Sequence, residues 1–68
     1  MLIKLNRAYL RIQKESMPVD SLERLTKYLH EIWVTFSEDT HSIVIKAEPD
    51  RLYNILYRIS LHFDIELM

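Results

Sequence analysis

Between residues 7 and 14, apolar and polar side chains alternate along the chain. Successive residues of a strand point to opposite faces, so this alternation predicts a half-buried β-strand. The expected buried face holds Ala8, Leu10 and Ile12, and the expected open face holds Arg7, Tyr9, Arg11 and Gln13.

The residues before this strand have the opposite parity. Ile3 and Leu5 are apolar at odd positions, whereas the strand is apolar at even positions. A bulge near Lys4–Asn6 would restore a single buried face, and so would a separate N-terminal arm, residues 1–6, that packs elsewhere. The pattern leaves both interpretations open.

Residues 15–20 contain a proline and are typical of a turn. The apolar residues after this segment recur with the period of a helix. Asp20 is the expected N-cap, and Glu23, three residues later, would complete a capping box. Steps of three and four residues then define one apolar stripe, which consists of Leu22, Leu25, Leu29 and Ile32.

Two β-rich segments come next. Residues 33–36, Trp-Val-Thr-Phe, and residues 43–47, Ile-Val-Ile-Lys-Ala, are rich in aromatic and β-branched side chains. The polar residues 37–42 separate them, which predicts a hairpin. Because the loop lacks the glycine of the tightest turns, we expect it to have four or more residues.

A second helix is expected to open at residues 48–50, because proline suits the first helical position and acids suit the positive helix end. Its buried stripe would be Leu52, Ile55, Leu56, Ile59 and Phe63. A further row, Tyr53, Tyr57 and Leu61, either widens this stripe or forms a partner surface. Residues 64–68 alternate again, which predicts a short terminal strand.

The expected order is therefore β-α-β-β-α-β in a single α+β domain, residues 1–68. This order resembles the ferredoxin-like arrangement, in which two helices cover one face of a four-stranded antiparallel sheet. The first and third strands would be central. The motifs of the families that share this layout are absent: there is no cysteine pair for a metal carrier and no glycine for a phosphate loop.

Composition narrows the chemistry further. The chain has 68 residues, a formal charge of −1, no cysteine and no glycine, so thiolate chemistry and glycine-rich phosphate loops are excluded. The three histidines are far apart in sequence, and Ser60 and His62 would point different ways on a helix. We therefore expect no catalytic residues, no metal site and no cofactor, hence no enzyme. No membrane span and no secretory signal is indicated, so a cytoplasmic location is expected.

The candidate surface is the open side of the sheet. Residues 1–16 carry four basic side chains and one acidic one, whereas residues 17–68 carry five basic and nine acidic side chains. Small domains without disulfides often bury more apolar surface by association. We therefore expect a non-catalytic interaction module that self-associates, as a homo-oligomer, or docks on a larger protein through its open sheet face. The alternative is single-stranded nucleic-acid binding. The residues expected to bind the partner are Arg7, Tyr9, Arg11, Trp33, Val44 and Lys46.

Overall fold

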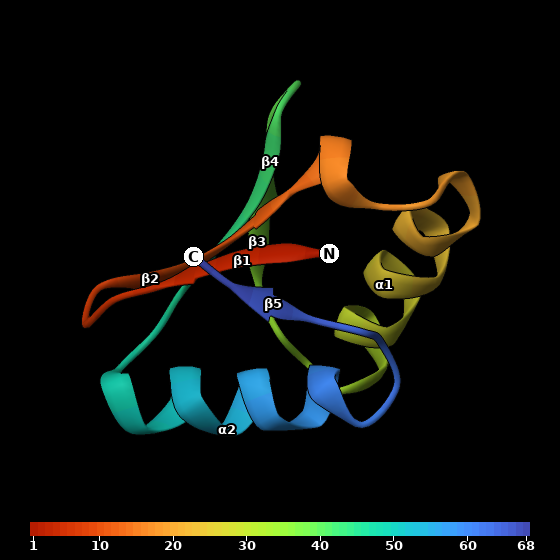
Figure 1. Cartoon of the computed structure of the whole chain (residues 1–68). Helices are drawn as coiled ribbons and strands as arrows, with labels where there is room; N and C mark the ends of the chain where they lie inside the picture. The colour runs from red at the N-terminus through yellow and green to blue at the C-terminus, as the bar shows by residue number, and fades with distance from the viewer.

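Five strands and two α-helices make up the computed structural model, which describes residues 1–68 (Figure 1). In chain order the elements are β1 (Leu2–Leu5), β2 (Tyr9–Gln13), a short 3-10 helix (Lys14–Ser16), α1 (Val19–Glu31), β3 (Phe36–Glu38), β4 (Ser42–Lys46), α2 (Pro49–Ser60) and β5 (Glu66–Leu67). The strands form one mixed sheet in the order β3-β4-β2-β1-β5. The class is therefore α+β, as the sequence predicts.

The finer topology differs from the prediction of a four-stranded antiparallel, ferredoxin-like sheet. The elements from β2 to β5 follow the expected β-α-β-β-α-β order, but β1 is an additional strand. It pairs antiparallel with β2 on one side and parallel with β5 on the other. β1 thus lies between two strands that the prediction placed side by side, and the parallel pair makes the sheet mixed.

A tight hairpin between β1 and β2 explains the change of parity in the sequence. Leu5 is paired with Leu10 and Ile3 with Ile12, so an odd residue of β1 always faces an even residue of β2. Paired residues of neighbouring strands point to the same face, and both sets of side chains therefore enter one core. Neither the bulge nor the separate arm is needed.

The core lies between the helices and one face of this sheet. Its fully buried side chains come from three strands and from both helices, and they form one cluster. They are Ile3, Leu10, Ile12, Leu25, Leu29, Ile43, Ile45, Leu52 and Ile59. The apolar stripes predicted for both helices are thereby confirmed at their central positions. Leu22, Ile32, Leu56 and Phe63 pack at the margins.

Helix α1 begins earlier than its sequence predicts. Pro18 is its N-cap and no side chain caps it, so the expected capping box of Asp20 and Glu23 is not formed. Asp20 lies in the first turn instead, where a carboxylate favours the positive end of the helix. Helix α2 begins as expected, with Pro49 in its first turn.

The C-terminal end of α1 corrects the strand predicted at residues 33–36, because only Phe36 of this segment is in a strand. Trp33 has a φ of 61°, the left-handed conformation. The Trp33 N–H donates to the His30 carbonyl at 3.1 Å and the Val34 N–H to the Leu29 carbonyl at 2.9 Å. These two bonds form a Schellman motif with tryptophan at the position where glycine is usual.

Both hairpins close without glycine through the same device. Asn6 Oδ1 accepts the N–H groups two and three residues later, at 2.8 and 2.9 Å. Asp39 Oδ1 accepts the corresponding groups of the β3–β4 hairpin at 2.8 and 2.7 Å. A side-chain oxygen thus replaces the backbone turn, and no residue of either turn has a positive φ. The β3–β4 loop, residues 39–41, is accordingly shorter than the four residues expected.

The two N–H bonds also lower the pKa of Asp39 below its ordinary value of 3.8, since they favour the charged carboxylate. The contribution of this carboxylate to the stability of the fold is complete above its ordinary pKa of 3.8, and it is lost as the pH falls through the lowered pKa. We expect Asp39→Ala to lower the urea midpoint at pH 7, whereas Asp39→Asn, which keeps the acceptor, lowers it less. The difference in midpoint between the natural chain and Asp39→Asn should shrink from pH 7 to pH 3. A difference that is independent of pH would contradict this account.

The outer side of α2 is not part of the core. Tyr53, Tyr57 and Leu61 remain 64%, 64% and 60% exposed, so the interpretation of this row as a widened core stripe is wrong. The terminal strand predicted at residues 64–68 is present in a shorter form as β5.

Candidate binding surface

The sheet face opposite the helices carries the candidate surface, which we call the open face. Because the apolar residues of β1, β2 and β4 point to the core, the alternate residues point away from it. Those of the three central strands are Leu2, Lys4, Tyr9, Arg11, Gln13, Ser42, Val44 and Lys46. Lys4, Arg11 and Lys46 are exposed, and Tyr9 and Val44 are half-buried.

Strand register brings the basic residues around one aromatic ring. Lys46 is paired directly with Tyr9 across β2 and β4, and Lys4 is paired with Arg11 across β1 and β2. The guanidinium carbon of Arg11 lies 5.1 Å from the centroid of the Tyr9 ring, a cation–π contact. Val44 lies across from Arg11 on β4. The open face thus presents flat and apolar surface between three cations.

No carboxylate balances these charges on β1, β2 or β4. The nearest acid in register is Glu66 on β5, which is paired with Leu2. Like charges directly opposite each other destabilise a sheet, and Lys4 and Arg11 are such a pair. In a chain whose formal charge is −1, this arrangement separates positive charge onto one face. A face of this kind has a positive electrostatic potential.

Four of the six residues singled out from the sequence lie together on the open face. They are Tyr9, Arg11, Val44 and Lys46. Arg7 is exposed in the β1–β2 turn, beside the end of β2. Trp33 is in the turn after α1, where its carbonyl accepts a hydrogen bond from Arg51 Nη2 of α2 at 3.4 Å, so it does not belong to the open face.

Sequence reasoning missed Lys4. It lies between Ile3 and Leu5, both of which point to the core side of β1. Had the parity change been interpreted as a hairpin, the alternation of the strand would have placed Lys4 on the open face beside Arg11.

The other titratable groups are arranged differently. Ser60 Oγ donates to the carbonyl of Tyr57. The His62 ring packs against the ring of Tyr28, with their centroids 4.9 Å apart. Ser60 and His62, which are near each other in sequence, therefore each contact another residue and do not form a nucleophile–base pair. No three histidine, aspartate or glutamate side chains gather as a possible metal site.

Neither α1 nor α2 has the length and apolar character needed to cross a bilayer. No protein family, curated protein or solved structure matches the chain.

Proposed function

We propose that the chain is a non-catalytic module that binds single-stranded nucleic acid on its open face. The observation that supports this proposal is the set of three cations, Lys4, Arg11 and Lys46, around Tyr9 with no carboxylate on the same strands. Proteins that bind single strands combine a positive surface for the phosphates with aromatic rings for the bases.

Each part of the open face has a distinct role in this proposal. Lys4 and Lys46 lie on either side of β2 and attract backbone phosphates. The Tyr9 ring and the Arg11 guanidinium offer two flat groups on which bases stack. Val44 supplies apolar contact beside them. Stacking and phosphate attraction are common to all bases, so binding is expected to be sequence-tolerant.

Replacement of Tyr9 tests the stacking role. Tyr9→Leu keeps an apolar side chain but removes the ring, and loss of one stacking platform weakens binding by about fivefold or more. Tyr9→Phe keeps the ring and should bind like the natural chain. Fluorescence anisotropy with labelled oligo(dT) and oligo(U) measures both. Equal affinity of Tyr9→Leu and Tyr9→Phe would contradict the proposal, as would equal affinity for a duplex.

Self-association is the second candidate, and Trp33 favours it. The residue is 88% exposed, and it occupies a left-handed position where glycine is the stable residue. Strained backbone positions are found at functional sites, and tryptophan is enriched among the residues that anchor protein contacts. Contact between two open faces is disfavoured because their cations would repel each other. Trp33 therefore supports association on the helix side of the molecule.

We expect Trp33→Gly to raise stability by about 0.5–1 kcal/mol, since glycine adopts the left-handed conformation without a Cβ clash. The same variant should lower the mass measured by light scattering over a concentration series. Trp33→Asn, which also tolerates this conformation, should lose association equally. Oligomers of unchanged mass in both variants, or a natural chain that is monomeric at every concentration, would contradict the second candidate.

A further inference from the structure

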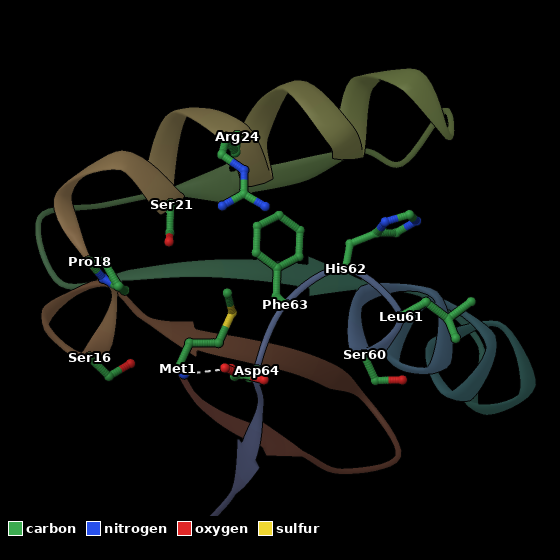
Figure 2. A pocket seen from close by; sticks show the side chains of 10 residues that line it. All are labelled: Met1, Ser16, Pro18, Ser21, Arg24, Ser60, Leu61, His62, Phe63 and Asp64. Carbon is green, nitrogen blue, oxygen red and sulfur yellow. Dashed lines mark hydrogen bonds between the residues drawn. The ribbon is translucent and has the colours of Figure 1, made fainter.

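A cavity of about 480 Å³ lies on the helix side, away from the open face (Figure 2). Its walls come from the start of α1, the N-terminal residue and the connection between α2 and β5. Figure 2 shows Ser21 and Arg24 of α1 on one side of this space, with Phe63 and the side chain of Met1 between α1 and the strands.

Ser21 is the unusual member of this cavity. The residue is only 8% exposed, and its Oγ takes part in no hydrogen bond within the chain. Every fully buried side-chain oxygen of the protein has a hydrogen-bond partner, so the Ser21 Oγ is not one of them. The hydroxyl therefore remains accessible, and Figure 2 shows it directed into the cavity. An accessible hydroxyl without a partner in the chain is free to donate a hydrogen bond to a ligand in the cavity.

Arg24 follows Ser21 by three residues, so both side chains lie on the same side of α1. Arg24 belongs to neither of the two ion pairs in the chain. Its guanidinium carbon lies 5.0 Å from the centroid of the Phe63 ring, which holds the cation beside the cavity. A free guanidinium fork and a free hydroxyl together match the two oxygens of a carboxylate.

The remaining polar groups of the cavity favour a ligand with one negative charge over a ligand with two. Ser16 and Ser60 already donate their hydroxyl protons to the carbonyls of Gln13 and Tyr57, so they add no free donor. The Asp64 carboxyl group and the Met1 ammonium, which donates to the Asp64 carbonyl at 2.8 Å, also line the cavity. Their opposite charges offset each other, so Arg24 leaves one net positive charge for a ligand. Met1 and Phe63 supply apolar wall. We infer that this cavity binds a small organic carboxylate, with the carboxylate on Ser21 and Arg24 and its apolar body on Met1 and Phe63.

Titration with sodium hexanoate, followed by amide and arginine side-chain signals in two-dimensional NMR, tests this inference. We expect saturable shifts at Ser21, Arg24 and Phe63 with a dissociation constant in the millimolar range. Hexylammonium chloride, which has the same apolar body and the opposite charge, should not saturate these signals. Inorganic phosphate should bind more weakly than hexanoate.

Two variants at the site and one control variant separate specific binding from unspecific effects. Arg24→Gln should weaken hexanoate binding by about tenfold, because a hydrogen bond to a charged group is lost. Ser21→Ala, which fits a helix well, should weaken it severalfold and leave the fold intact. Arg51→Gln, on α2, removes a cation elsewhere and should bind hexanoate like the natural chain. Shifts that do not saturate, or equal affinity in Arg24→Gln and Arg51→Gln, would overturn the inference.

Discussion

The Lys4→Glu variant is expected to lose oligonucleotide binding and to gain stability. Lys4 is exposed on β1 and lies directly opposite Arg11 of β2. A glutamate turns this like-charge pair into an attractive one, which stabilises the sheet by roughly 0.5 kcal/mol. In the proposed complex, the same change removes a phosphate contact and adds a repulsive charge to the open face. We expect affinity for oligo(dT) to fall by about tenfold or more at low salt.

The matched control carries the same charge change on the helix layer. Lys27→Glu alters an exposed residue of α1 and should leave the affinity close to that of the natural chain. Anisotropy titrations and urea unfolding of both variants supply the two readouts. If Lys4→Glu and Lys27→Glu weaken binding equally, net charge alone accounts for the attraction and the open face is not the binding surface.

Ile3→Ala is expected to cause a large loss of stability. Ile3 is fully buried, and it is paired with Ile12 of β2 on one side and with Leu67 of β5 on the other. Truncation of a buried isoleucine costs about 2–5 kcal/mol. A domain of this size has a total stability of about 3–10 kcal/mol. One substitution in the first three residues is therefore expected to take a large part of the free energy of unfolding.

The neighbouring residue provides the control for Ile3. Lys4→Ala alters the exposed side of the same strand and should change the free energy of unfolding by less than about 0.5 kcal/mol. Urea unfolding followed by circular dichroism measures both variants. A loss of under about 1 kcal/mol in Ile3→Ala would show that β1 is a loosely attached arm and not the strand that links β5 to β2.

Periodicity predicted the parts of this fold that depend on local burial. The stripes centred on Leu25 and Leu29 in α1 and on Leu52, Ile55 and Ile59 in α2 are in the core. The start of α2 at Pro49 follows from the fixed φ of proline, which is a property of that residue alone.

The errors arose where a local backbone motif or a long-range strand pairing overrides the preference of a single residue. Trp33 has strand propensity, yet the Schellman bonds to His30 and Leu29 fix it in a turn. Asp20 is a good capping residue, but α1 begins two residues earlier, after Pro18. The parallel pairing of β1 with β5 joins residues near opposite ends of the chain, and no local pattern encodes it.

The open face was predictable where it depends on the alternation of side chains within one strand. Alternation alone places Tyr9 and Arg11 on the outer side of β2. The register that puts Lys46 opposite Tyr9 depends on the β2–β4 pairing, which the strand order suggested. The cavity at Ser21 could not be predicted, because it is bounded by three segments that are distant in sequence.

The salt dependence of oligo(dT) binding tests the central claim most directly. If Lys4, Arg11 and Lys46 each neutralise one phosphate, a plot of the logarithm of the binding constant against that of the salt concentration should be linear with a slope of about −2. In Lys4→Glu the slope should become less steep by about 0.7 or more. Absence of binding at low salt, or an affinity that does not change with salt, would contradict the account.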